Sequence, residues 1–145
     1  MKRERRARVE DIHETAAALP GVTIENGSSG NPVYQVRGKS FIFFRNPRPD
    51  ALDPATGERL GDVIVLWVAD DADKQSLIGD LATPFFTTAH FNGHLSVLLR
   101  ASLIGELTRQ EIIELVEEAW LSRAPKRLAA TWSAQHLAPH VSDRG

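Results

Sequence analysis

The stretch TRQEIIELVEEAW, residues 108 to 120, decides the fold more than any other part of the chain. Thr108 and Glu111 match the capping box, in which each side chain accepts a hydrogen bond from the other residue's backbone N–H, so a helix is predicted to begin here. Apolar residues then recur at helical spacing and form one stripe: Ile112, Leu115, Val116, Ala119 and Trp120. Burying the four large members stabilises the fold by roughly 6 to 12 kcal/mol before entropy is subtracted. The stripe therefore predicts a helix that closes a core, and loss of Trp120 is expected to unfold the domain.

A predicted hairpin lies directly before this helix. The β-rich runs PFFTTAHF and HLSVLLR, at 84–91 and 94–100, flank Asn92-Gly93. Asn-Gly is the strongest short-range hairpin signal, and type I′ geometry is expected there. The implied register pairs Phe86 with Leu99 on one face of the sheet, which leaves Phe85 on the other, less apolar face.

A second hairpin is predicted nearer the N-terminus. Glycine in Arg37-Gly38-Lys39-Ser40 is expected to come first in a two-residue type II′ turn. This register pairs Val36 with Phe41 and places Arg37 and Lys39 at an exposed basic tip.

The remaining elements follow from periodicity and from turn residues. Helical spacing predicts a helix over 5–19, which ends at Pro20-Gly21. The apolar run VIVLWV, 63–68, predicts a strand covered on both faces, and a helix over about 72–82 follows, capped by Asp70 or Asp71. The proline-rich residues 46–62 read as a surface loop. The fold class is therefore α+β, an antiparallel sheet with helices in the order α-β-β-β-β-α-β-β-α.

Length and composition indicate one domain. The chain has 145 residues, of which 42% are hydrophobic and 25% charged, close to the average of globular proteins. We expect a basic arm over 1–8, a single domain over 9–132 and a flexible tail over 133–145. The chain has no cysteine, which suits a reducing compartment, and no apolar run long enough for a signal peptide or a membrane span. We therefore expect a cytoplasmic protein without membrane association.

The net charge of −2 conceals a partition of charge along the chain. The opening MKRERRAR carries five basic residues and one acid, which leaves 12 basic and 18 acidic residues for the rest. Within that acidic remainder, residues 26–49 and 119–141 contain no acid. Whether these basic stretches meet on one face is a spatial question.

The order of several motifs resembles a known family. LPGV at 19–22, YQVRGKSFIFF at 34–44 and the final hairpin with its helix are similar to members of the MmcQ/YjbR family, over about 19–132. The chain looks most like an actinobacterial-type branch, in which a loop like DPATGERL, 53–60, precedes the VLWVAD strand. The resemblance implies a two-layer α/β sandwich, called "double wing", and DNA binding. It carries no catalytic motif.

No metal, cofactor or catalytic site is predicted. His90 and His94 are four residues apart, but the turn between them is expected to send them to opposite faces rather than pair them for zinc. The acids Asp70, Asp71 and Asp73 lack the glycine and glutamate of a calcium loop and read as helix caps. The serines beside glycines have no paired base, so an enzyme is not expected.

Two functions remain open from the sequence. The first is a DNA-associated accessory or regulatory protein that binds double-stranded DNA weakly, with salt dependence, through phosphates. Its candidate contacts are Arg3, Arg5, Arg6, Arg37, Lys39, Arg45, Arg123, Lys126 and Arg127. The second is a protein-interaction module, whose partner can be a second copy of the chain. It would use an exposed sheet face around Phe85, Leu98 and Phe44. The oligomeric state does not follow from the sequence.

Overall fold

The computed structural model describes residues 5–26, 31–45, 63–80, 83–87 and 93–142. Its elements, in chain order, are α1 (Val9–Ala18), β1 (Val22–Asn26), β2 (Pro32–Val36), β3 (Lys39–Arg45), β4 (Val63–Trp67), α2 (Asp71–Gly79), β5 (Phe85–Phe86), β6 (Ser96–Arg100), the 3-10 helix η3 (Ala101–Glu106), α3 (Arg109–Arg123) and α4 (Lys126–Ser142). The six strands form one antiparallel sheet in the order β1-β2-β3-β4-β6-β5. The predicted α+β class and sheet are confirmed.

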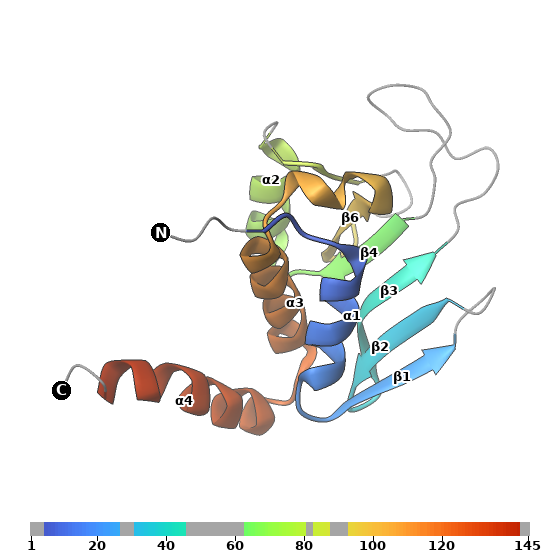
Figure 1. Cartoon of the computed structure of the whole chain (residues 1–145). Coiled ribbons are helices and arrows are strands. Elements are labelled where there is room, and N and C mark those ends of the chain that lie inside the picture. Colours follow the sequence, from blue (N-terminus) through green and yellow to red (C-terminus); the bar gives the residue numbers. More distant parts are fainter. Residues whose placement is uncertain (1–4, 27–30, 46–62, 81–82, 88–92, 143–145) are drawn as a thin grey trace.

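Helices α1 and α3 lie together on one face of the sheet (Figure 1). The capping box starts α3 as predicted, because Glu111 N donates to Thr108 Oγ1 over 3.1 Å and Thr108 N donates to Glu111 Oε1 over 2.8 Å. The helix then buries Ile112, Val116 and Trp120 completely against the sheet. The core therefore lies between the two helices α1 and α3 and the strands, and the apolar stripe of α3 closes it as predicted.

The opposite face of the sheet is also covered at its centre. Val63, Val65 and Leu98 form a second buried cluster, against which Phe43 and Phe86 pack. A strand such as β4, buried on both faces, reads as the continuous apolar run seen in the sequence. The prediction for VIVLWV is thus confirmed.

The predicted registers of both hairpins were wrong, the first by two residues beside its turn and the second by one. Arg37 and Gly38, not Gly38 and Lys39, form the first turn, and both have positive φ, 50° and 85°, as a type I′ turn requires. Val36 therefore pairs with Lys39, and a bulge between Gln35 and Tyr34 then shifts the register by one residue, so that Tyr34 pairs with Ile42.

In the second hairpin, Phe86 pairs with Leu98 and Phe85 with Leu99. Phe85 consequently faces the core with 6% of its surface exposed, and Leu98 is 2% exposed. Phe85 and Leu98, which the sequence placed on one exposed face, therefore lie on opposite faces of the sheet, and both are buried. His90 and Asn92, which belong to this predicted hairpin, lie outside the described residues.

The helices at the chain ends differ from expectation. α1 begins at Val9, because residues 5–8 run extended beside the start of α3 instead of continuing the helix. α3 ends at Arg123, since Ala124 precedes Pro125 and adopts an extended backbone. The chain then forms α4, which projects from the body in Figure 1. The predicted domain boundary at residue 132 lies inside this helix.

Candidate functional site

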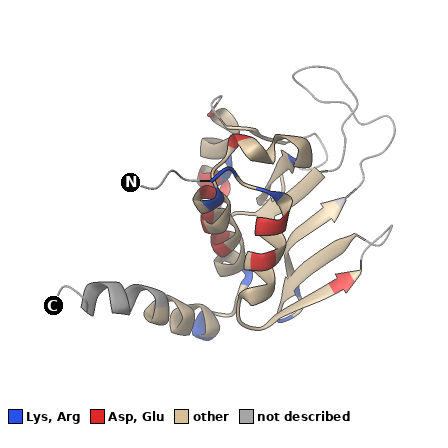
Figure 2. Cartoon of the chain, viewed as in Figure 1, with Lys and Arg blue, Asp and Glu red and all other residues tan. Residues whose placement is uncertain are grey.

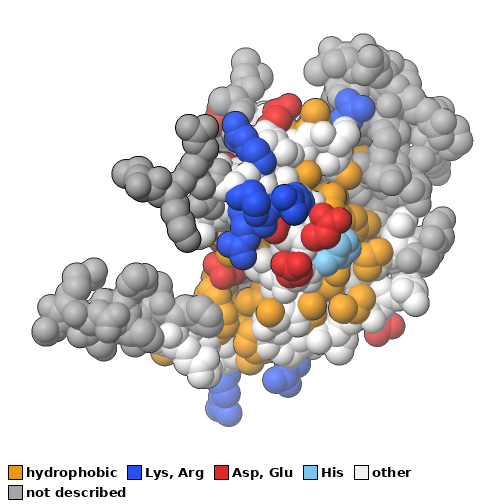
Figure 3. Space-filling view, in the orientation of Figure 1, with side chains coloured by type: hydrophobic (Ala, Val, Ile, Leu, Met, Phe, Trp, Pro, Cys, Tyr) orange, Lys and Arg blue, Asp and Glu red, His pale blue; other side chains and the backbone are white. Residues whose placement is uncertain are grey.

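The structure brings two acid-free stretches of the sequence to one end of the molecule. The turn between β2 and β3 carries two cations, and the junction of α3 and α4 carries three. We call this group the basic end; its members are Arg37, Lys39, Arg123, Lys126 and Arg127. Figure 3 shows blue side chains projecting at the bottom of the molecule, where this turn and the start of α4 lie.

Arg123 fixes the end of α3 to the sheet. Its Nε donates to the backbone oxygen of Ser40 over 3.0 Å, and its guanidinium carbon lies 5.0 Å from the ring centroid of Trp67. The hydrogen bond joins residues 83 positions apart and places the last turn of α3 beside the first residues of β3. Arg123 is half-buried, so it positions the neighbouring cations more than it extends into solvent.

A second contact ties the turn to α4. A Cβ built on Gly21 would lie 3.1 Å from Arg37 Nε and 3.2 Å from a methyl carbon of Leu128. Gly21 has a φ of 71°, so glycine suits this position for both conformation and space. The turn, the start of β1 and the first turn of α4 are therefore close-packed neighbours.

The basic end is exposed and has no acid within its own segments. Arg37, Lys39, Lys126 and Arg127 are exposed, and residues 20–23, 36–40 and 119–128 contain no Asp or Glu. The acidic residues of α1 and α3 lie instead away from this end of the molecule (Figure 2), and the first turn of each helix contains at least one of them. Four exposed cations held at one end without local compensation form a positive patch.

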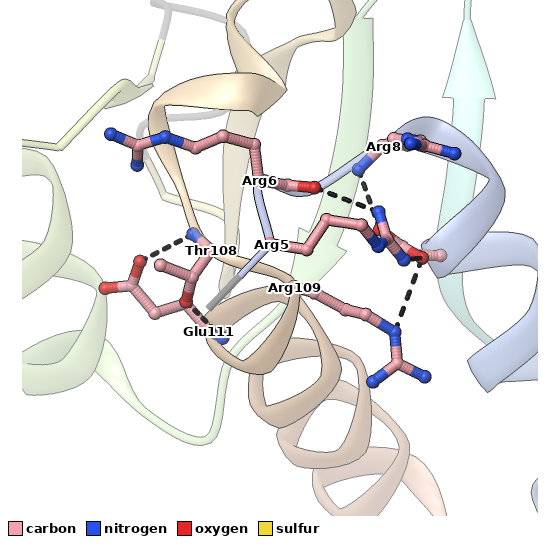
Figure 4. Close-up of polar contacts among 7 residues, drawn as sticks. Arg5, Arg6, Arg8, Thr108, Arg109 and Glu111 are labelled. Atoms are coloured by element: carbon pink, nitrogen blue, oxygen red, sulfur yellow. Dashed lines mark hydrogen bonds and ion pairs between the residues drawn. The ribbon is translucent and has the colours of Figure 1, made fainter. Parts of the chain in front are cut away.

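The N-terminal arginines form a different cluster at the other end of α3. Figure 4 shows Arg5, Arg6, Arg8 and Arg109 around the first turns of α1 and α3; we call them the N-terminal cluster. Ala7 N donates to Leu107 O over 2.9 Å, and Arg109 N donates to Arg5 O over 2.7 Å. Residues 5–8 are thus part of the folded domain, whereas a separate arm was expected.

Asp11 compensates this cluster. Its buried carboxylate accepts two hydrogen bonds from Arg5, at 2.7 and 3.2 Å, and one from Arg8 N at 2.8 Å. Arg109 Nε lies 3.7 Å away. The hydrogen bond from Arg5 is the main reason why the pKa of Asp11 lies below its usual 3.8, although burial opposes the shift. Arg5 is therefore a structural ion-pair partner rather than a free phosphate contact.

The candidate residues of the sequence consequently do not converge on one site. The basic end and the N-terminal cluster are separated by the 15 residues of α3, about 21 Å at the rise of an α-helix. Arg45 ends β3 at the opposite end from Lys39, paired with Val63. Arg3 lies outside the described residues.

Sequence reasoning missed a histidine–tyrosine pair. His13 Nδ1 lies 2.5 Å from the hydroxyl of Tyr34, and the His13 ring stacks on Phe44 at 4.8 Å between centroids. Burial lowers the pKa of His13 and raises that of Tyr34, while Glu10 acts on His13 in the opposite direction. No spacing in the sequence could reveal this pair, because α1 and β2 meet only through the fold.

A buried lysine was also missed. Lys74 of α2 is fully buried, and its Nζ donates to the carbonyl oxygen of His94 over 2.5 Å. Burial is the main cause of its lowered pKa. The ammonium therefore anchors the segment before β6 to α2, and the sequence predicted no role for Lys74.

A shallow cavity of about 150 Å³ lies between α2 and α3. Trp67, Leu77 and Leu115 form apolar walls, and Asp73 and Glu118 stand beside them. Burial, followed by repulsion from Asp73, raises the pKa of Glu118. Across the residues that the structure describes, no group of three or more His, Asp or Glu side chains could hold a metal ion. No helix in the described ranges is long and apolar enough to cross a membrane.

Comparison with known proteins gives one family and several uncharacterized relatives. A family model described as YjbR matches residues 17–122, which includes the β2–β3 turn and ends one residue before Arg123. Uncharacterized proteins of Mycobacterium tuberculosis and Mycobacterium bovis are each 39% identical to the chain over 74 residues, or 51% of this chain. The match covers 55% of each relative, so the chain spans about half the length of the curated relatives it matches.

Proposed function

This chain belongs to the YjbR family, and from its basic end we propose that it is a non-enzymatic, DNA-associated accessory protein that contacts the phosphates of double-stranded DNA. The observation that carries the proposal is the hydrogen bond from Arg123 to Ser40 O, which brings the cations of a strand turn and of a helix junction to one place. Exposed cations on rigid elements bind phosphates mainly by releasing counterions from DNA.

The start of α4 adds a second favourable feature at the same place. Lys126 and Arg127 occupy its first turn, where backbone N–H groups and the positive end of the helix dipole attract anions. A phosphate at this position would meet two side-chain cations as well as the helix end. Such contacts fix the position of DNA without reading its sequence, so we expect weak and sequence-tolerant binding.

The N-terminal cluster supports phosphate binding less well. Asp11 accepts hydrogen bonds from Arg5, and the acidic Glu111 lies in the first turn of α3 next to Arg109. A phosphate would have to compete with these carboxylates for the guanidinium groups. We therefore place the primary contact at the basic end and treat Arg6 and Arg8 as the comparison surface.

The non-enzymatic part of the proposal rests on how the titratable groups are engaged. Lys74 is buried and donates a hydrogen bond to His94 O, and Tyr34 is buried with its hydroxyl beside His13 Nδ1. Each of these groups has a structural role that accounts for its altered pKa. A role on DNA also fits the cytoplasmic location that we propose.

A fluorescence-anisotropy titration on duplex DNA at about 50 and 200 mM salt tests the proposal. We expect micromolar binding at the lower salt that weakens at the higher. The double variant Lys126→Ala, Arg127→Ala should bind more weakly on every duplex, with a salt slope smaller by about 0.9 for each phosphate that the variant no longer neutralises. Both residues are exposed, so the variant is expected to fold.

The matched control is Arg6→Ala, Arg8→Ala, which removes the same charge from exposed residues at the other end of α3. It should reduce binding much less than the variant of the basic end. Absence of binding at the lower salt would overturn the proposal. Equal losses in the two double variants would also overturn it, because they would show an effect of net charge alone.

A further inference from the structure

The first strand leaves one edge of the sheet open. β1 is the terminal strand, and among the described residues no strand pairs with its outer edge (Figure 1). Four of its five residues, from Thr23 to Asn26, are exposed. An open edge presents unpaired backbone N–H and C=O groups and can accept a further strand.

Apart from the charge of Glu25, β1 lacks the features with which proteins usually block such an edge. All five of its residues pair with β2 in an unbroken register, from Val22 with Val36 to Asn26 with Pro32. The strand contains no proline, lysine or bulge, and three of its residues are β-branched. The opposite edge strand, β5, has only two residues and offers little to pair with. Of the two sheet edges, β1 is therefore the one suited to strand addition.

The exposed side chain at the centre of β1 is apolar. Ile24 is 52% exposed, and within the described ranges only Leu95, at 43%, is another exposed large hydrophobic residue. Ile24 pairs with Tyr34, which is buried in the core, so both side chains lie on the sheet face that α1 covers. The apolar layer under α1 thus continues to the open edge of the sheet, where Ile24 leaves about half of its surface exposed.

We propose that the outer edge of β1 pairs antiparallel with β1 of a second copy of this chain. A two-fold axis perpendicular to the sheet relates two such strands, and it keeps the helices of both copies on the same face. Ile24 would then meet Ile24 of the second copy at the margin of both cores. The dimer is a continuous sheet formed by the six strands of each copy.

The sequence of β1 selects the register centred on Ile24. This register uses the whole strand and places Thr23 opposite Glu25 and Val22 opposite Asn26, without like charges in contact. Centring on Glu25 would oppose two carboxylates, which destabilises a strand pair. Centring on Thr23 would bring Gly21, with its φ of 71°, against Glu25 and shorten the ladder. Self-complementarity in one register is the reason for choosing a second copy as the occupant.

Sedimentation equilibrium over a micromolar to millimolar concentration series tests this proposal, which does not depend on DNA binding. Because one short strand pair makes a small interface, we expect a weak reversible dimer. The average mass should rise from 16.0 kDa toward twice that value. Hydrogen exchange of the β1 amides should slow as the concentration rises, since the edge becomes paired.

Ile24→Lys places a charge at the proposed contact, and Leu95→Lys is the matched control at the other exposed hydrophobic residue. Circular dichroism establishes that both variants are folded. We expect the control to dimerise like the wild type and Ile24→Lys to stay at the monomer mass over the same series. A wild type that stays monomeric, or an Ile24→Lys variant that dimerises as the wild type does, overturns the proposal.

Discussion

The indole Nε1 of Trp120 donates a hydrogen bond to the backbone oxygen of Pro20 over 3.1 Å and so joins two residues that are 100 positions apart. Trp120 is the fully buried last residue of the α3 stripe, and its ring centroid lies 5.5 Å from that of Trp132 in α4. One side chain therefore connects α3, the turn after α1 and the first half of α4.

Replacing Trp120 separates the packing of this residue from its hydrogen bond. Trp120→Ala should lower the free energy of unfolding by about 3 to 5 kcal/mol, because burial is lost and a cavity is left. Trp120→Phe keeps an aromatic ring but leaves Pro20 O without its donor, and should cost about 1 to 3 kcal/mol. Urea denaturation measures both, with the exposed Ile24→Ala as a control. A Trp120→Phe cost equal to that of Trp120→Ala would contradict this division.

The cap of α3 makes a second prediction. Thr108→Ala removes the oxygen that accepts from Glu111 N, and should reduce the free energy of unfolding by about 1 kcal/mol. Thr108→Ser keeps the oxygen and should restore most of the loss. The control Thr131→Ala changes an exposed threonine of α4, whose hydroxyl donates to Arg127 O. Thermal unfolding that places Thr108→Ala within error of this control would refute the role of the cap.

The parts of the fold that depend on local sequence were predicted correctly. The capping box and the apolar stripe predict α3, and the apolar run predicts β4, because each of these signals lies within the element that it predicts. The position of a two-residue turn is decided differently. The turn lies at Arg37 and Gly38, and a bulge between Tyr34 and Gln35 then shifts the pairing of β2 with β3, so that Tyr34 pairs with Ile42. A one-residue shift of pairing changes the face on which side chains lie, and turn residues alone do not reveal such a bulge.

The candidate site was predicted only in part, since charge counts do not show pairing. The acid-free stretches around Arg37 and Arg123 do meet at the basic end. The sequence favoured the arginines of the N-terminal arm over the other basic stretches, but the carboxylate of Asp11, in the first turn of α1, binds Arg5. Carboxylates are common in the first turn of helices, and only the folded structure shows which cation such a carboxylate binds.

The Asp11 carboxylate predicts an acid-sensitive stability. Its pKa is lower in the folded protein than the usual 3.8, so the unfolded chain binds a proton more readily. The stabilisation is thus complete above about this value and is lost as the pH falls through the folded pKa. Asp11→Asn should cost about 1 to 2 kcal/mol at neutral pH, discounted for the exposure of Arg5.

Urea denaturation across an acid pH series measures this effect. The difference between wild type and Asp11→Asn should shrink as the pH falls below about 3.8. Arg5→Gln should show the same pattern with a smaller amplitude, because Arg8 N still donates to the carboxylate. A wild-type advantage that stays constant into strong acid would rule out Asp11 as its source.

The His13–Tyr34 pair predicts a second pH effect, at higher pH. Burial lowers the pKa of His13 below 6.5, so the folded state favours the neutral ring while the unfolded chain takes up a proton at its ordinary pKa. Stability from this residue is therefore complete above about 6.5 and declines as the pH falls toward the folded pKa. The slope cannot exceed about 1.4 kcal/mol per pH unit for one proton.

His13→Gln removes the titrating ring and should flatten the dependence of the unfolding free energy on pH just below neutrality. Tyr34→Phe should keep the titration but lower stability by about 1 kcal/mol at neutral pH, because the hydroxyl beside His13 Nδ1 is removed. Asp11→Asn serves as the control, since its carboxyl titrates at much lower pH and should leave this slope unchanged. If the slope persists in His13→Gln, another group titrates in this range, and the contact between α1 and β2 makes no pH-dependent contribution.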